Sequence, residues 1–135
     1  MILIEWKEDF SVHIAEIDRQ HQTLIDIINE LYSAMLSRQT KQTLSAIIDK
    51  TYNYAKSHFA FEEEYFGLYG FPESQAHKAI HRELMEKIED YKVQFEAGRL
   101  MLSIEIMQFL KEWLENHMLR EDKKYSTFLN ERGVH

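Results

Sequence analysis

The chain has 135 residues, of which 44% are hydrophobic, and this length suits a single compact domain with one core. Four glycines and one proline leave few residues for the turns of a sheet, so the composition favours an all-α fold. Sixteen basic against twenty-three acidic residues give a net charge of −7, which argues against nucleic acid as a partner, and the lack of cysteine excludes disulfides and thiolate metal sites.

Residues 1 to about 14 are expected to form an ordered N-terminal arm. Acidic residues lie where a secretory signal would have its apolar run, and no stretch of 18 apolar residues follows that would insert into a membrane. We therefore expect a cytoplasmic protein without membrane insertion. Trp6 and Phe10 are large enough either to pack the arm on the domain or to form an interface with another molecule.

Four segments carry apolar residues at the three- and four-residue spacing of an amphipathic helix. They span about residues 15–37, 41–68, 72–97 and 103–129. The third is expected to begin at Pro72, because a proline has no N–H to leave unpaired in a first helical turn, and to end before Gly98. Short polar breaks make neighbouring helices antiparallel. The sequence therefore predicts an all-α, antiparallel up-down-up-down four-helix bundle with an N-terminal arm.

Every predicted helix carries polar groups on the face that should be buried. In chain order these groups are His21, His58, Glu62, His77, His81 and His117. The second helix has a His–Glu pair and the third a His–His pair, each with its members four residues apart. Such residues lie about 6 Å apart along a helix and on one side of it, so each pair can direct two donors at one point. Burying these groups unpaired costs on the order of 1–3 kcal/mol each, and a shared metal ion removes that cost.

Each pair taken alone is explained better without a metal, as a surface His–Glu contact or as two unrelated core histidines, because such spacings arise by chance in helical sequences. Their occurrence on all four helices favours a site of nitrogen and oxygen ligands. The fourth helix adds two acids after His117. Glu121 follows at the four-residue spacing, whereas Asp122 lies about 140° around an ideal helix from His117, so periodicity alone selects Glu121. His13 and His135 lie on no helical face and receive no role.

Four motifs together resemble the hemerythrin family, specifically its single-domain bacterial members. They are DRQH at residues 18–21, HFAFEE at 58–63, HKAIH at 77–81 and HMLREDKKY at 117–125. The similarity covers nearly the whole chain and includes WKEDFSV in the arm and YGFPESQAH at the start of the third helix. It implies one hemerythrin-like domain over residues 1–135, and a monomer.

The resemblance also implies a non-haem centre of two iron ions with a bridging oxo or hydroxo group. The ligands implied by motif position are His77, His81 and His117 for one iron, His21 and His58 for the other, and Glu62 and Asp122 as bridges. The family pattern thus selects Asp122 over Glu121, which requires the fourth helix to be distorted or oblique between residues 117 and 122. The implied function is reversible binding of O2, for storage, transport or delivery, as peroxide at the five-coordinate iron, without enzyme activity.

Neighbouring motif positions imply an apolar pocket for the diatomic ligand, although each of its residues taken alone is explained better by ordinary core packing. The pocket residues are Leu24, Phe59, Trp113, Leu114 and Met118. Three alternatives remain open: a sensor of O2, nitric oxide or redox state, a di-iron enzyme that acts on peroxide or nitric oxide, and a zinc protein. A ferritin-like oxidase is disfavoured, because the sequence contains no Glu-x-x-His pair of the kind that class uses.

Overall fold

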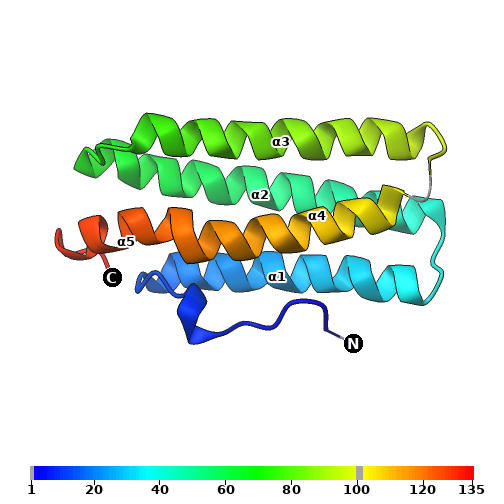
Figure 1. Cartoon of the computed structure of the whole chain (residues 1–135), viewed down its shortest axis with the longest axis horizontal. Helices are drawn as coiled ribbons and strands as arrows, with labels where there is room; N and C mark the ends of the chain where they lie inside the picture. The colour runs from blue at the N-terminus through cyan, green and yellow to red at the C-terminus, as the bar shows by residue number, and fades with distance from the viewer. Residues whose placement is uncertain (1, 100–101) are drawn as a thin grey trace.

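The computed structural model describes residues 2–99 and 102–135, and its long helices lie side by side in a bundle (Figure 1). Three rods are single helices and the fourth has three parts. The rods are α1 (Ala15–Leu36), α2 (Lys41–Tyr69), α3 (Ser74–Glu96), and α4 (Leu102–Asn116) followed by the π-helical turn η2 (His117–Glu121) and α5 (Asp122–Asn130). α1 and α3 each contact α2 and α4, which places the four rods in a square. The predicted all-α bundle is confirmed.

A side-chain hydrogen bond marks the start of α2, and a glycine with a left-handed backbone marks the ends of α2 and of α3. The hydroxyl of Thr40 accepts a hydrogen bond from the backbone N–H of Thr43 at 3.1 Å and so caps the N-terminus of α2. Gly70 ends α2 with a φ of 69°, and Gly98 follows α3 with a φ of 107°. Both values lie in the left-handed region, which a side chain with a Cβ atom adopts only at a cost. Glycine is therefore used at the two sharp helix ends that need it.

The third helix begins two residues later than the sequence suggested. α3 starts at Ser74, whose backbone N–H donates to the carbonyl of Phe71 at 3.1 Å, and Pro72 and Glu73 lie in the turn between them. Proline suits the second position of a β-turn as well as it suits the first turn of a helix, so its presence alone does not locate the start. The backbone N–H of His77 donates to the carbonyl of Glu73 at 3.0 Å, so His77 lies in the first turn of α3.

Residues 2–14 form an arm that packs against the bundle, with one short 3-10 turn, η1 (Glu8–Phe10). The side-chain oxygen of Asn29 on α1 accepts hydrogen bonds from the N–H groups of Leu3 and Ile4, each at 2.9 Å. Phe10 is fully buried, and the ring of Trp6 meets it edge-on with centroids 5.9 Å apart. These aromatic residues therefore serve to pack the arm on its own chain.

The buried apolar side chains form two clusters along the bundle. The larger includes Leu31 and Ile88, and the smaller includes Phe66 and Leu129 near the C-terminal end. The helix positions between the two clusters carry buried polar groups, and this polar layer is the candidate site. Within the described part of the chain, no helix is both long and apolar enough to cross a membrane.

Candidate metal centre

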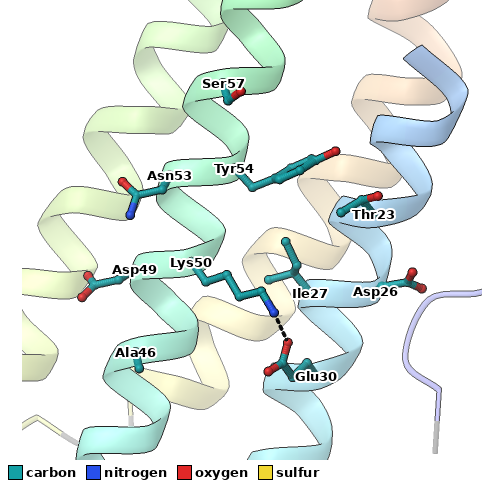
Figure 2. A pocket seen from close by; sticks show the side chains of 10 residues that line it. All are labelled: Thr23, Asp26, Ile27, Glu30, Ala46, Asp49, Lys50, Asn53, Tyr54 and Ser57. Carbon is teal, nitrogen blue, oxygen red and sulfur yellow. Dashed lines mark hydrogen bonds and ion pairs between the residues drawn. The ribbon is translucent and has the colours of Figure 1, made fainter. Parts of the chain in front are cut away.

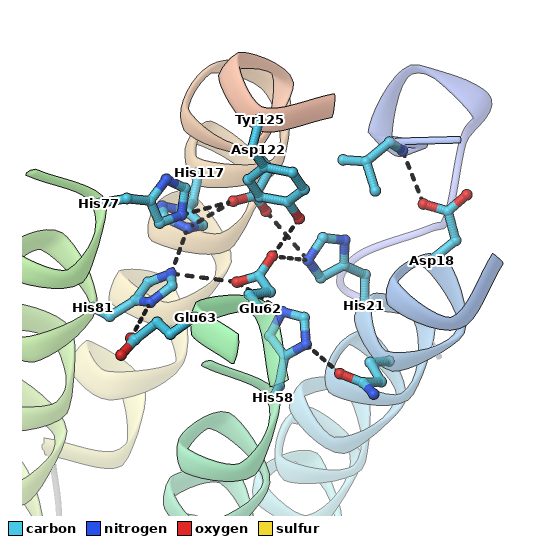
Figure 3. A network of polar contacts seen from close by, with 12 residues as sticks. Asp18, His21, His58, Glu62, Glu63, His77, His81, His117, Asp122 and Tyr125 are labelled. Carbon is cyan, nitrogen blue, oxygen red and sulfur yellow. Dashed lines mark hydrogen bonds and ion pairs between the residues drawn. The ribbon is translucent and has the colours of Figure 1, made fainter. Parts of the chain in front are cut away.

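Seven polar side chains from all four rods converge in the layer between the two apolar clusters (Figure 3). They are His21 on α1, His58 and Glu62 on α2, His77 and His81 on α3, His117 on η2 and Asp122 at the start of α5. None of them is more than 4% exposed. The structure thus brings together the seven residues selected from the sequence and the family pattern, whereas His13 and His135 are exposed.

Glu62 lies at the meeting point of three helices. Its Oε1 atom is 3.5 Å from Nε2 of His58, four residues earlier on α2, and 3.3 Å from Nε2 of His81 on α3. Its Oε2 atom is 3.8 Å from Nε2 of His21 on α1 and accepts a hydrogen bond from the hydroxyl of Tyr125. A single carboxylate therefore faces imidazoles from α1, α2 and α3.

Asp122 directs its two carboxylate oxygens to different histidines. Oδ1 is 2.9 Å from Nε2 of His117 and 3.2 Å from Nε2 of His77. Oδ2 is 3.2 Å from Nε2 of His21. The carboxylate thus lies between His77 on α3 and His117 on η2 on one side and His21 on α1 on the other, which is the placement that a bridging ligand would need.

The π-helical turn explains how Asp122 reaches this position. Its backbone N–H donates to the carbonyl of His117, five residues earlier, so this turn holds one residue more than an α-helical turn. Asp122 is consequently on the same side as His117 and fully buried, while Glu121 points outward and pairs with Lys124 at 3.2 Å. The distortion expected from the family pattern is confirmed, and the choice of Glu121 by α-helical periodicity is wrong.

Two hydrogen bonds outside the cluster orient its imidazoles. Nδ1 of His58 is 2.7 Å from Oε1 of Gln20, and Nδ1 of His81 is 2.8 Å from Oε2 of Glu63. The amide nitrogen of Gln20 donates to Glu16 at 3.2 Å, which leaves its oxygen to face His58. Because both partners accept, each Nδ1 carries a proton, and the hydrogen bond that it donates directs the Nε2 atom of the same ring into the layer. Gln20 and Glu63 were not selected from the sequence, although each directly adjoins a selected residue.

Burial and close partners set the charge of the cluster. Burial lowers the pKa of His58 to about 4, so this imidazole is neutral at neutral pH. Burial and the nearby Asp122 act to raise the pKa of Glu62, but the imidazoles beside it outweigh them and lower it to about 2. Burial raises the pKa of Tyr125 well above its ordinary value, so its hydroxyl remains a donor to Glu62. An ionised carboxylate and a neutral imidazole are the protonation states that a metal cation requires.

Several ligand-type atoms in the layer are buried without a hydrogen-bond partner. They are Nε2 of His21 and of His77, Oε1 of Glu62 and both carboxylate oxygens of Asp122. The potential ligand atoms form two groups, in each of which they lie within 4.8 Å of one another: Glu62, His77, His81, His117 and Asp122, and His21, His58 and Glu62. Imidazole nitrogen and carboxylate oxygen suit iron, and the sharing of Glu62 suits two neighbouring ions. The residues present therefore fit a di-iron centre.

A small apolar cavity of about 20 Å³ lies beside this layer. Four of the five predicted pocket residues line it, namely Leu24, Phe59, Trp113 and Leu114. The ring of Phe59 stacks on His81 with centroids 3.8 Å apart, and that of Trp113 stacks on His117 at 4.3 Å, so the cavity wall continues into the histidine layer. Met118 is fully buried in the larger apolar cluster but is not among the residues that line the cavity.

A larger open groove, of about 920 Å³, lies on the outer face between α1 and α2 (Figure 2). None of the seven converging residues lines it. Lys50 pairs with Glu30 across the groove at 2.9 Å, and Asp49 pairs with Lys92 at 2.5 Å. Three of the four charged side chains that line the groove are thus paired at the surface, and the groove is separate from the buried chemistry.

The chain is an antiparallel four-helix bundle with a histidine and carboxylate layer in its core, an arrangement that helical bundles use to build metal sites. The hemerythrin HHE cation binding domain family model matches residues 12–129. A bacteriohemerythrin from Stenotrophomonas maltophilia is 36% identical over 126 residues, which cover 93% of this chain and 81% of the relative. One from Pseudomonas aeruginosa is 33% identical over 125 residues, covering 93% and 80%. The chain belongs to the hemerythrin family.

The structural comparison agrees with this assignment. A crystal structure of wild-type hemerythrin matches with a TM-score of 0.86 at 28% identity, covering 93% of this chain and 96% of the other. The resemblance stated from the sequence motifs is therefore confirmed, both by related sequences and by the fold.

Proposed function

We propose that the chain binds two iron ions in the buried layer and that the iron pair binds O2 reversibly, for storage, transport or delivery. In this proposal His77, His81 and His117 hold one ion, His21 and His58 hold the other, and Glu62 and Asp122 lie between them with an oxo or hydroxo group. The observation that carries it is the convergence of buried nitrogen and oxygen atoms, several of them unpaired, into two groups that share a carboxylate.

The unequal number of imidazoles supports binding of a small ligand at one ion. With the same bridging groups on both sides, the ion held by two histidines would have one protein ligand fewer than the ion held by three, which would leave a position for a small ligand. When bound, the iron pair supplies the two electrons that O2 accepts on binding and returns on release. The chain contributes orientation, because Gln20 and Glu63 keep the Nε2 atoms of His58 and His81 directed at the layer.

The apolar cavity supports a diatomic ligand. A volume of about 20 Å³ exceeds the roughly 10–15 Å³ that one water-sized molecule needs. Thr51 is the one polar residue that lines the cavity in the described part of the chain, and its hydroxyl already donates to the carbonyl of Ile47 at 2.9 Å. Apolar walls exclude water, which slows proton delivery and irreversible oxidation of the iron.

An optical experiment tests the function. Protein loaded anaerobically with ferrous iron is exposed to O2, and its visible absorption is recorded before and after O2 is removed under vacuum. We expect a spectrum that appears with O2 and disappears without it, in the wild type and in His13→Ala, but not in His58→Ala. His13→Ala is the matched control, because it removes an exposed histidine outside the layer. Continuous consumption of O2 over repeated turnovers indicates an enzyme, and one zinc ion per chain contradicts the proposal.

We also propose that residues 1–135 form one domain that acts as a monomer in the cytoplasm. Contacts between the two ends of the chain support a single domain. The hydroxyl of Ser126 donates to the carbonyl of Val12 at 2.7 Å, and the amine of Lys123 donates to the carbonyl of Ser11. Sedimentation equilibrium tests the monomer, and fractionation of the producing cells tests the location.

A further inference from the structure

A second depression, of about 340 Å³, lies on the outside of the bundle between α2 and α3. It reaches the polar layer, because buried Phe59 and His81 both line it. Three cationic side chains also line it, Lys56 from α2 and Lys78 and Arg82 from α3. The depression therefore combines surface cations with a histidine that belongs to the proposed iron site.

The three cations are not neutralised by the chain itself. In the part of the chain that the structure describes, Lys56, Lys78 and Arg82 form no ion pair and no hydrogen bond. The one carboxylate that lines the depression, Glu63, is engaged with Nδ1 of His81 at 2.8 Å. On a chain with a net charge of −7, this is a local positive surface, and such a surface attracts a negatively charged partner.

Within this depression, Glu63 and His81 link the surface to the buried layer, and Figure 3 shows the two side chains pointing toward one another. The side chain of Glu63 is 29% exposed and accepts a hydrogen bond from His81, whose other nitrogen faces Glu62 at 3.3 Å. Phe59 stacks on His81 with ring planes 8° apart. One hydrogen bond and one imidazole ring thus separate a solvent-exposed carboxylate from the proposed iron position.

We propose that this depression is the docking site of an acidic one-electron carrier protein that returns the oxidised iron pair to its ferrous state. The inference rests on the proposed function, since only a bound iron pair needs reduction. Two carriers each lose one electron, two ferric ions become two ferrous ions, and no bond forms between carrier and chain. Lys56, Lys78 and Arg82 supply the charge that attracts the carrier, and His81 supplies the route inward.

Reduction kinetics test the docking site. Diferric protein is mixed in a stopped-flow instrument with reduced plant-type ferredoxin, an acidic one-electron protein, and its loss of absorption is followed. We expect Lys56→Glu/Lys78→Glu to slow the reaction at low salt at least roughly tenfold and to remove the fall in rate that rising ionic strength causes in the wild type. Lys50→Glu/Lys111→Glu changes the net charge equally at two lysines that pair elsewhere on the surface, and we expect it to alter the rate less than about twofold.

Two further measurements separate docking from iron chemistry. Reduction by the radical cation of methyl viologen, which has no acidic surface, should not slow in either double variant. In amide NMR spectra of the iron-loaded protein, oxidised ferredoxin should perturb residues 52–63 and 78–85, and Lys56→Glu/Lys78→Glu should remove that perturbation. Arg82→Glu, at an exposed position, replaces the double variant if the latter does not fold.

The outcomes distinguish the two proposals. Equal slowing in both double variants, or NMR perturbation confined to another face, overturns the docking site. Normal reversible O2 binding together with unaltered ferredoxin kinetics rejects the docking site alone. Failure to bind O2 reversibly rejects the proposed function, while the NMR titration still decides whether this surface binds an acidic protein.

Discussion

Removal of iron should destabilise this fold strongly, because the core contains the proposed ligands. Five potential ligand atoms, on His21, Glu62, His77 and Asp122, are buried without hydrogen-bond partners. At about 1–3 kcal/mol each, leaving them unpaired costs on the order of 10 kcal/mol. This cost is comparable to the whole free energy of unfolding of a typical domain, about 5–15 kcal/mol. Water that enters the iron-free layer recovers part of it, so we expect a loss of about 5 kcal/mol.

Thermal unfolding followed by circular dichroism measures this loss. For a domain of this size, each kcal/mol shifts the unfolding temperature by about 3–4 °C, so iron removal should lower it by about 15–20 °C. A chelator should have little effect on His58→Ala/Glu62→Ala, which lacks two of the proposed ligands and provides the control. Equal unfolding temperatures of iron-loaded and chelator-treated wild type, within about 2 °C, would refute the reasoning, because the layer would then be satisfied without a metal.

Three substitutions test individual contacts. Asp122→Ala should lower the iron content, measured by elemental analysis, below two ions per chain, whereas Glu121→Ala should leave it unchanged because Glu121 points outward. Equal loss of iron in the two variants would contradict the role of the π-helical turn. Glu63→Ala should weaken iron binding roughly 10–100-fold in chelator competition, because His81 loses the acceptor for Nδ1, whereas Glu63→Gln keeps an acceptor and should bind nearly normally. Tyr125→Phe should reduce the free energy of unfolding by about 1–3 kcal/mol in urea titrations, because Glu62 loses a buried donor; unchanged stability would show that this hydrogen bond contributes nothing.

The bundle and its polar layer were predictable because both depend on helical periodicity. Residues four apart on an amphipathic helix share a face, so His58 with Glu62 and His77 with His81 had to point in one direction once their helices formed. Burial of each apolar face then requires the four helices to pack together. The converging histidines follow from these two conditions without knowledge of the fold.

Features that depend on departures from periodicity were not predictable in this way. The π-helical turn moves Asp122 inward and Glu121 outward, and α-helical spacing selects the opposite residue. Gln20 and Glu63 act through contacts between two helices, and the spacing of residues within one helix does not reveal such contacts. The sequence predicts a start of α3 at Pro72 because proline has no N–H to leave unpaired in a first helical turn, but proline fits the second position of a β-turn equally well, and α3 starts at Ser74.

Diffraction from crystals of the iron-loaded protein at the iron absorption edge tests the central claim most directly. We expect two anomalous peaks in the buried layer, one beside His77, His81 and His117 and the other beside His21 and His58, with density from Glu62 and Asp122 reaching both. A single peak, or iron bound only at the surface, would contradict a di-iron centre in this chain.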